Sequence, residues 1–383
     1  MLNVGVIGLG NTGNQIASLA YEQLKIPVMA VNSSEKDLET INNNIPKKLI
    51  TDADGESKGA GKNRQLAKKY LKDSIMTFLS SEDVQDFVGD LDVLFIVSST
   101  GGGTGSGTSL IMSSIIASMF VDVHVITIGV LPVMNEALSA HVNTLEYLNE
   151  LYSTLDGQTY MLYDNDKYSG MPSYKMMNLV NDEVVKDIDV LRCTYNYTTK
   201  YDSIDEEDMR RLISFPGRIL VARLEDIKER DLDKDSIEDL LIKKIKSNAH
   251  TEIQRDQKVI ATGIIANLSE AVFSEFDNHI EKVRDFIGDP DHDFNHLYVN
   301  EERKMPNNVF LIIGGLSVIN DRIAKISDRI EEIEQKQKTR EEENSLNDLS
   351  VSELSQKVSS KDKSKKTSAS NVDIAGIFSK FGI

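Results

Sequence analysis

A glycine-rich segment between two strongly apolar segments constrains the fold of this chain more than any other feature of its sequence. Residues 101–107 read Gly-Gly-Gly-Thr-Gly-Ser-Gly. The apolar run 91–97 before them has the length of a buried strand, and residues 110–117 after them have the length and apolar spacing of a helix. The glycine segment is therefore predicted to be a strand-to-helix turn.

A turn of this kind can hold phosphate. Glycines let the backbone N–H groups approach a ligand closely, and the helix N-terminus behind them favours negative charge. The hydroxyls of Thr104, Ser106 and Thr108 add further donors. A flexible glycine linker is the alternative, but a linker would not be expected between two strongly apolar elements.

A second glycine turn lies near the N-terminus, between a short apolar strand and a helix. Gly8, Gly10 and Gly13 match the G-x-G-x-x-G dinucleotide fingerprint. A site for NAD also needs a carboxylate after the second strand, to bind the ribose hydroxyls. That strand, residues 27–31, is followed by Asn32. An NAD-binding oxidoreductase remains an alternative, although the carboxylate that it needs is missing at this position.

A third glycine turn covers residues 55–64. It contains Gly-Lys but fails the P-loop pattern, because Glu56 stands where the first glycine belongs and Asn63 follows the lysine. Lys62 and Arg64 could reach a terminal phosphate as a point charge and as a fork of donors. The alternative is a solvated basic turn.

Strands and helices alternate along the first half of the chain, and residues 123–131 form another apolar strand. This order predicts an α/β fold with a Rossmann-like parallel sheet. Ligands bind such sheets beyond the carboxyl ends of the strands, where all three glycine turns are expected.

The string Gly-Gly-Gly-Thr-Gly-Ser-Gly resembles the signature of the tubulin/FtsZ superfamily, and the resemblance extends over roughly residues 2–320. It implies a GTPase that binds GTP or GDP with Mg²⁺ and assembles head to tail into protofilaments. Hydrolysis would be activated by polymerisation. The resemblance does not indicate which residues of the chain would bind the metal ion.

The same resemblance implies a set of nucleotide-binding residues. Glu136 would contact the sugar and Asn165 the sugar or the base. Tyr174 would stack on guanine, and Asn178 would bind the base edge. A core tyrosine and a solvated asparagine are the alternative for the last two. Ala140 replaces the arginine usual in the family. The full set is Gly8, Gly10, Asn11, Thr12, Asn14, Gln15, Gly59, Ala60, Gly61, Lys62, Asn63, Thr100, Gly101, Gly102, Gly103, Thr104, Gly105, Ser106, Gly107, Glu136, Asn165, Tyr174 and Asn178.

The acidic segment 201–212 resembles the family's synergy loop, which completes the GTPase site of the neighbouring subunit. Asp205 and Asp208 would there be catalytic, orienting the attacking water and helping to take its proton. Ser203 replaces the asparagine usual in the family. The alternative is a capped helix start, and both interpretations can hold together.

The chain is predicted to have two domains joined by a long helix and followed by a tail. The second is a small α+β domain with strands at 219–222, 258–266 and 308–315 and helices at 236–249 and 273–287. The predicted segments are 1–172 for GTP binding, 173–192 for the connecting helix, 193–320 for the synergy loop and α+β domain, 321–344 for a C-terminal helix and 345–383 for the tail.

The last two segments suggest contacts with partners. Isoleucines at three- and four-residue spacing give the helix after 320 a narrow apolar stripe, which would dock on the next filament subunit or on its own domain. Residues 345–371 are predicted to be disordered, with a cluster of lysines. The apolar residues 372–383 then resemble a recognition peptide, for which a DNA-bound adaptor is the expected partner. The stripe is Ile323, Ile326, Ile330 and Ile333, and the lysines are Lys361, Lys363, Lys365 and Lys366.

Charge and composition limit the remaining possibilities. The net charge of −18 should make the body repel nucleic acid and anionic membranes. No apolar run is long enough to cross a membrane, no signal peptide is visible, and the single cysteine, Cys193, fits a reducing cytoplasm. Within the superfamily, the replacements at 140 and 203 and the charged C-terminal helix favour a TubZ-like plasmid or phage DNA segregation protein. A cell-division protein like FtsZ is the alternative.

Overall fold

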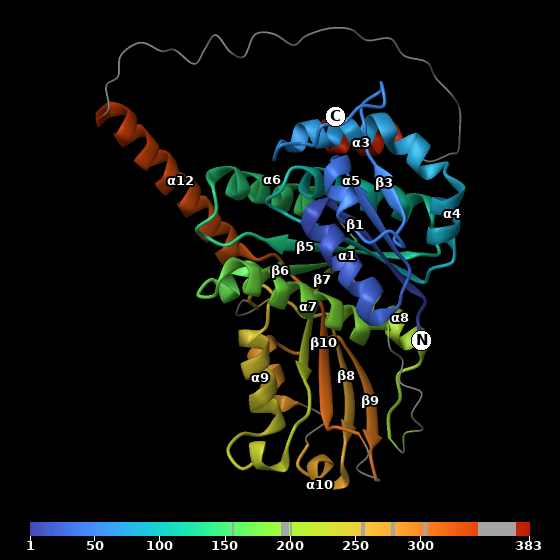
Figure 1. Ribbon diagram of the computed structural model, residues 1–383. Coiled ribbons are helices and arrows are strands. Elements are labelled where there is room, and N and C mark those ends of the chain that lie inside the picture. The colour runs from blue at the N-terminus through green and yellow to red at the C-terminus, as the bar shows by residue number, and fades with distance from the viewer. Residues whose placement is uncertain are drawn as a thin grey trace.

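One mixed sheet runs through the described part of the chain (Figure 1). The structure, a computed structural model, describes residues 1–154, 157–192, 199, 201–253, 257–276, 280–301, 305–343 and 373–383, with backbone only at 340–343. Its strands are β1 (Val4–Leu9), β2 (Val28–Asn32), β3 (Lys47–Leu49), β4 (Val93–Ser99), β5 (His124–Leu131), β6 (Thr159–Asp164), β7 (Gly217–Leu224), β8 (Ala261–Leu268), β9 (His292–Val299) and β10 (Asn308–Leu316).

The strand order is β3-β2-β1-β4-β5-β6-β7-β10-β8-β9 among the residues described. Strands β1 to β6 are parallel, whereas β10 is antiparallel to both β7 and β8. The predicted α/β class with a smaller α+β part is therefore confirmed. The two parts share the sheet, because β6 pairs with β7 at Thr159–Gly217 and Tyr160–Arg218.

Helices cover both faces of the parallel part (Figure 1). Strand β1 is buried on both faces, as expected of a continuous apolar run: Val6 packs in the core with α1 and α7, and Ile7 in the core with α3 and α5. The helices are α1 (Gly10–Leu24), α2 (Glu35–Glu39), α3 (Arg64–Leu79), α4 (Glu82–Gly89), α5 (Thr104–Met119), α6 (Leu138–Thr154), α7 (Ser173–Arg192), α8 (Glu206–Ser214), α9 (Ile237–Ser247), α10 (Glu270–Phe273), α11 (Glu281–Ile287), α12 (Asn320–Glu343) and α13 (Ile374–Lys380), with short 3₁₀ turns at Asn165–Tyr168 and Glu229–Asp231.

A buried charged cluster fixes α7 to the strands of both parts. The Asp187 carboxylate on α7 accepts hydrogen bonds from Tyr163 Oη at 2.8 Å and from Arg223 Nε at 2.6 Å, and His250 Nε2 lies 2.8 Å from it. Burial raises the pKa of Asp187, but the contacts with His250 and Arg223 outweigh burial and hold the pKa below its ordinary value.

Several predicted elements differ from the structure. The helix predicted over 273–287 is two short helices, α10 and α11, and the strands β3 and β9 were not predicted. Cys193, the linker 345–371 and its lysine cluster lie outside the described residues. No helix in the described part of the chain is both long and apolar enough to cross a membrane.

The apolar stripe of α12 packs on its own N-terminal domain over its first turns. Ile326 is fully buried, and Ile323 and Ile330 pack against the core beside α6. The later turns of α12 point away from the body (Figure 1). The stripe was predicted to dock either on the next filament subunit or on its own domain. These three isoleucines pack on their own domain.

Candidate nucleotide site

The three glycine turns meet at the carboxyl edge of the parallel strands. A Cβ atom placed on Gly105 would lie 2.6 Å from the carbonyl oxygen of Leu9, and one on Gly103 would lie 2.8 Å from Cα of Lys62. Real Cβ atoms do not come so close to backbone. The backbones of the three turns are therefore in direct contact, which only glycine allows at these positions.

The turn around residue 60 has an unusual backbone. Gly59 and Gly61 adopt φ of +84° and +56°, and Lys62, which is not glycine, adopts +64°. The left-handed region costs an L residue roughly 1–2 kcal/mol. Backbone strain of this kind is often kept where a side chain has a function, and the Lys62 side chain is exposed at this edge.

Asn143 on α6 ties two of the turns together. Its buried Nδ2 lies 3.0 Å from the carbonyl oxygen of Lys62, 3.2 Å from that of Gly101 and 2.9 Å from that of Gly102. Sequence analysis missed Asn143, because an asparagine inside an amphipathic helix carries no local signal. It positions the backbone that the glycines leave flexible.

The hydroxyls expected to donate to phosphate are mostly engaged elsewhere. Ser106 Oγ donates to the carbonyl oxygen of Gly102, and Thr108 Oγ1 donates to that of Thr104 at 2.7 Å. These two hydroxyls satisfy the first turns of α5 instead. Thr104 Oγ1 contacts Ser33 Oγ at 2.6 Å, and either atom can be the donor. The backbone N–H groups of the turn remain the better donors for an anion.

Thr100 and Asn63 also have structural partners. Thr100 Oγ1 lies 3.0 Å from Thr144 Oγ1, and the Thr100 N–H donates to the carbonyl oxygen of Val130 at 2.9 Å. Asn63 caps α3 by accepting from the N–H of Leu66 at 3.0 Å. Both side chains therefore hold the backbone in place at this edge of the sheet.

Arg64 does not face a phosphate, contrary to the sequence prediction. Its guanidinium is buried and donates to Glu146 at 2.9 Å, to Glu150 at 2.6 Å and to the carbonyl oxygen of Ser106 at 3.0 Å. The arginine therefore supports the start of α5 through its contact with Ser106. Of the two cations predicted to reach a phosphate, Lys62 is the one that is exposed.

A groove of about 890 Å³ lies between α1 and α7. It brings together Gln15 and Asn178, two of the predicted nucleotide-binding residues, although they come from distant parts of the chain. Tyr174, one turn before Asn178, is 64% exposed. It is therefore not a core tyrosine, and its ring is accessible to a flat ligand.

Other predicted residues lie around the same edge. Asn14 is buried; its Oδ1 accepts from the N–H of Val31 at 3.2 Å, and its Nδ2 has no hydrogen-bond partner among the residues that the structure describes. Glu136 is half-buried and accepts from the N–H of Val133 at 3.2 Å. Asn165 begins the 3₁₀ turn after β6. The unsatisfied Asn14 amide is the kind of group that a polar ligand completes.

The remaining predicted residues divide between the turns and the helix starts. Gly8 and Gly10 flank the end of β1, where Gly10 adopts φ +71°, and Ala60 is buried under its turn. Asn11, Thr12 and Gly107 lie in the first turns of α1 and α5. Asn32 uses its Oδ1 to accept from the N–H of Ser33 at 2.8 Å, so it closes a local turn.

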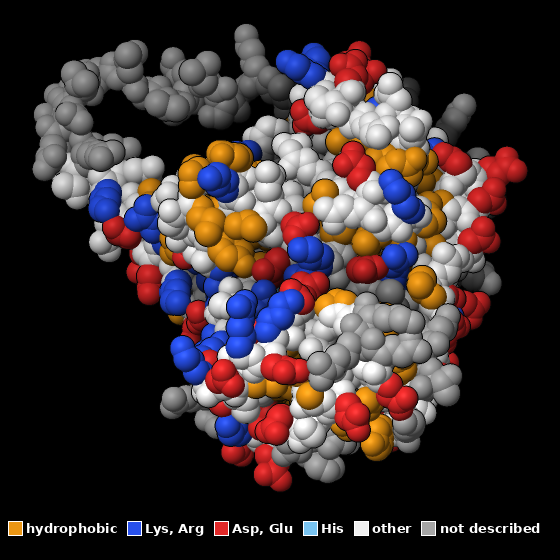
Figure 2. All heavy atoms as spheres, turned by 60° about the horizontal axis from the view of Figure 1, so that its bottom comes forward, with side chains coloured by type: hydrophobic (Ala, Val, Ile, Leu, Met, Phe, Trp, Pro, Cys, Tyr) orange, Lys and Arg blue, Asp and Glu red, His pale blue; other side chains and the backbone are white. Residues whose placement is uncertain are grey.

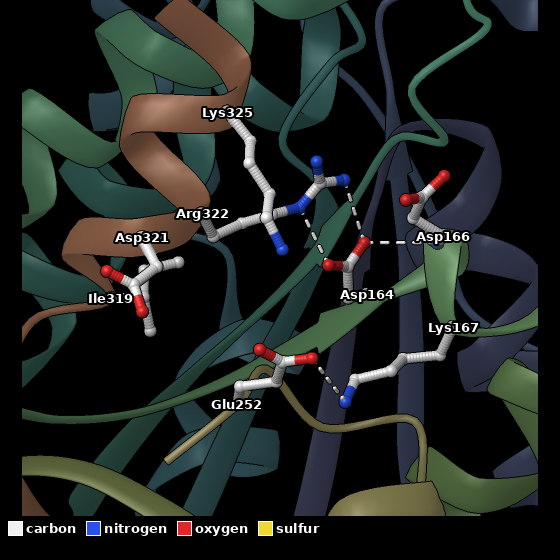
Figure 3. Close-up of a pocket in the computed structure, with 8 residues that line it drawn as sticks. All are labelled: Asp164, Asp166, Lys167, Glu252, Ile319, Asp321, Arg322 and Lys325. Carbon is white, nitrogen blue, oxygen red and sulfur yellow. Dashed lines mark hydrogen bonds and ion pairs between the residues drawn. The ribbon is translucent and has the colours of Figure 1, made fainter. Parts of the chain in front are cut away.

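A separate pocket of about 130 Å³ lies where α12 meets the end of β6 (Figure 3). There Arg322 on α12 forms an ion pair with Asp164, with Nε at 2.7 Å from Oδ2, and also donates to the carbonyl oxygen of Pro132 at 2.7 Å. Burial raises the pKa of Asp164, and the Arg322 charge opposes this rise. The contacts of Arg322 thus hold α12 against the loop that carries Glu136.

The predicted catalytic acids lie at the opposite end of the domain. Asp205 caps α8: its Oδ1 accepts from the N–H of Asp208 at 2.8 Å, and Asp208 Oδ2 accepts from the N–H of Asp205 at 3.3 Å. Arg210 on α8 pairs with Asp92, just before β4. Strand β4 runs from there to the glycine turn and is about 20 Å long. The capped helix start is thus observed, and the acids are remote from the turns of their own chain.

The surface charges and the candidate metal ligands add little evidence about what binds at this site. On the face shown in Figure 2, Lys and Arg side chains gather in one place among acidic ones. The described residues contain no group of three or more His, Cys, Asp or Glu arranged to hold a metal ion. Mg²⁺ bound with a nucleotide takes most of its oxygen ligands from phosphate and water. Its presence here remains a prediction.

The strand order and the three converging glycine turns are those of a tubulin-like fold. Residues 3–172 match the family described as the Tubulin/FtsZ family, GTPase domain. The matched residues span the part of the chain that precedes α7.

Curated relatives match over part of their length. The tubulin-like protein CetZ of Pyrococcus horikoshii is 26% identical over 166 residues, 42% of this chain and 44% of the relative. The tubulin-like protein TubZ of Clostridium botulinum C phage is 24% identical over 247 residues, 64% of this chain and 58% of the relative. The chain thus matches less than half of CetZ.

Solved structures match over nearly the whole fold. TubZ of Clostridium botulinum phage c-st has a TM-score of 0.69 at 18% identity, covering 87% of this chain and 98% of that one. A GTPγS-form protofilament of Bacillus thuringiensis serovar israelensis TubZ has a TM-score of 0.71 at 19% identity, covering 88% and 94%. At such identities the likeness is one of fold.

Proposed function

We propose that this chain binds GTP at the carboxyl edge of its parallel strands and hydrolyses it between two copies of the chain in a head-to-tail filament. One observation carries the proposal: the glycine turns and the acids of α8 lie at opposite ends of the N-terminal domain. A chain with this layout has half of a hydrolytic site at each end, and stacking two copies would join the halves.

The proposed reaction needs little covalent chemistry from the protein. Water attacks the γ-phosphorus of GTP, the bond from that phosphorus to the bridging oxygen breaks, and GDP and inorganic phosphate leave. The chain that holds GTP supplies backbone N–H groups of residues 101–107 and the Lys62 ammonium. Asp205 and Asp208 of the other copy would orient the water and accept its proton. Mg²⁺, if bound with GTP, would offset charge on the phosphates.

The cellular role proposed is the positioning of plasmid or phage DNA through an adaptor. The likeness to TubZ over most of the fold supports this choice, as do Ala140 and Ser203. A cell-division role is the second candidate, since FtsZ 1 of Methanocaldococcus jannaschii is 25% identical over 239 residues, covering 60% of this chain and 61% of that protein. A DNA adaptor that binds filaments of this chain would favour the first role.

The central test measures phosphate release and sedimentation in the same samples over a range of protein concentrations. The hydrolysis rate per chain should rise steeply at the concentration where polymer appears, because a lone chain has an incomplete site. NAD in place of GTP should give no polymer. A rate per chain that is constant across the assembly threshold would contradict the shared site.

Asn178→Ala should lower the affinity for GTP about tenfold and remove the preference for GTP over ATP. The amide offers both a donor and an acceptor to a base edge, and such a bond contributes roughly 1–1.5 kcal/mol. Leu179→Ala, in the same groove, is the control and should weaken GTP and ATP alike. Competition binding of the two nucleotides checks both. Unchanged GTP preference in Asn178→Ala would exclude its role.

Lys62→Gly should weaken GTP binding at least about tenfold while changing the free energy of unfolding by less than about 1 kcal/mol. Glycine relieves the left-handed backbone but removes the cation, and a hydrogen bond to a charged group contributes about 1.5–3 kcal/mol. Lys58→Gly removes the same charge from the same turn and should leave the affinity unchanged. Titration with GTPγS and denaturant unfolding measure the two effects. Equal affinities in all three proteins would show that Lys62 holds no phosphate.

A further inference from the structure

The C-terminal peptide, residues 373–383, lies on the N-terminal domain of its own chain. Helix α13 packs against α5, and Ile377, Phe378 and Phe381 are 9%, 3% and 4% exposed. In Figure 1 this peptide lies beside α3, next to the label of the C-terminus. The apolar side chains that suggest a recognition peptide are therefore covered by the protein itself.

A buried lysine holds the peptide in place. Lys68 on α3 is 1% exposed, and its Nζ donates to the carbonyl oxygen of Phe381 at 2.9 Å and to Glu150 at 2.7 Å. The same ammonium lies 6.0 Å from the centre of the Phe381 ring. A buried ammonium needs all its acceptors, because each missing one leaves a charged donor unsatisfied. Release of the peptide would remove one of them.

The same contacts continue to the glycine turn. Glu150 on α6 also accepts from Arg64 at 2.6 Å, and Arg64 donates to the carbonyl oxygen of Ser106 at 3.0 Å. Ser106 lies in the first turn of α5, inside the segment 101–107. The peptide is thus joined to this segment through four consecutive polar contacts, which run from Phe381 by way of Lys68, Glu150 and Arg64 to Ser106.

We propose that residues 373–383 are an intramolecular regulatory element that docks on α3 and α5 and keeps segment 101–107 in its nucleotide-binding shape. Peptide docking and nucleotide binding then strengthen each other by the same factor, because coupling between two sites is reciprocal. This coupling rests on the proposed function. A partner that binds the apolar face of the peptide must first detach it, and would thereby loosen the nucleotide.

The docked state is suited to reversal. Burial of three apolar side chains favours it, whereas the ordering of the peptide opposes it. The contact is also partly electrostatic, because it depends on Lys68, whose ion-pair partner Glu150 also pairs with Arg64. A small change at the glycine turn can therefore shift the balance.

The first test measures hydrogen–deuterium exchange of residues 374–381 in the full chain without nucleotide. Wild type should be protected, and the double variant Phe378→Ser, Phe381→Ser should exchange as a free peptide. The matched control, Ser379→Ala with Lys380→Ala, changes the exposed face of the same helix and should stay protected. Exchange of the wild-type peptide at the unprotected rate would overturn the docking. Protection that grows with protein concentration would also overturn it, since a second copy would then supply the peptide.

The second test compares dissociation constants for GTPγS below the assembly concentration. The double variant and Lys68→Met should both bind about fivefold more weakly than wild type, the low end for coupled sites. Lys68→Arg, which can donate to both acceptors, should restore most of the affinity, and GTPγS should slow peptide exchange about fivefold. Equal affinities in wild type and the double variant would overturn the coupling. A wild-type chain that binds no GTPγS would refute the proposed function and the coupling, while the nucleotide-free exchange still decides the docking.

Discussion

Asp208→Asn should bind GTP and polymerise like wild type but hydrolyse GTP about 10²–10⁴-fold more slowly, the usual loss for a positioned proton acceptor. The asparagine Oδ1 can still accept from the N–H of Asp205, so the helix cap should survive. Polymer formed by the variant should persist, because its GTP is not converted to GDP. Phosphate release and sedimentation in one sample measure the two properties separately.

The controls separate catalysis from folding. Glu207→Gln removes an exposed acid from the same turn of α8 and should hydrolyse GTP normally. Asp205→Asn keeps a good N-cap residue and should lose activity like Asp208→Asn. Normal turnover by Asp208→Asn in its polymer would refute the shared site. Failure to bind GTP would instead indicate a role for the segment in folding.

Gly105→Ala should abolish measurable GTP binding and assembly together and should lower the free energy of unfolding. The added Cβ would lie 2.6 Å from the carbonyl oxygen of Leu9, which is backbone and cannot rotate away. The glycine turns would have to separate, and overpacking of this kind typically costs about 1–3 kcal/mol. Isothermal titration with GTPγS and denaturant unfolding test the two losses.

Gly102→Ala is the matched control from the same string of glycines. Among the described residues, only Ser99 Oγ would lie within 4 Å of its Cβ, at 2.9 Å, and that hydroxyl can rotate away. Its free energy of unfolding should therefore stay within about 0.5 kcal/mol of wild type. If Gly105→Ala is as stable and binds GTPγS as tightly as wild type, the turns are not in the contact described here.

The glycine string shows what local sequence can determine. The apolar runs around residues 101–107 predict a strand, a turn and a helix. Strand β4 and helix α5 follow this order, although α5 begins at Thr104, inside the segment predicted to be the turn. The reason is that apolar periodicity and glycine conformation are local properties. The position of all three turns at one edge follows because parallel strands present their carboxyl ends together.

The roles of individual side chains at this edge depend on neighbours that are distant in the sequence. Arg64 follows Lys62 by two residues and has the charge that a phosphate requires, yet it is buried beside Glu150 and supports Ser106 from behind. Asn143 has no local signal and contacts two of the turns. Pairing of this kind depends on how α3 and α6 pack, which single-residue patterns do not contain.

The acids of α8 and the C-terminal peptide show most clearly which features local sequence predicts and which depend on tertiary contacts. Patterns of neighbouring residues are enough to predict the parallel sheet with its glycine turns, the acidic start of α8 and the apolar character of residues 372–383. The folded chain adds two facts: the acids of α8 lie a strand's length from the glycine turns of their own chain, and Phe381 packs against Lys68. Both facts depend on contacts between residues more than a hundred positions apart, and such contacts form only when the whole sheet and its helices are assembled.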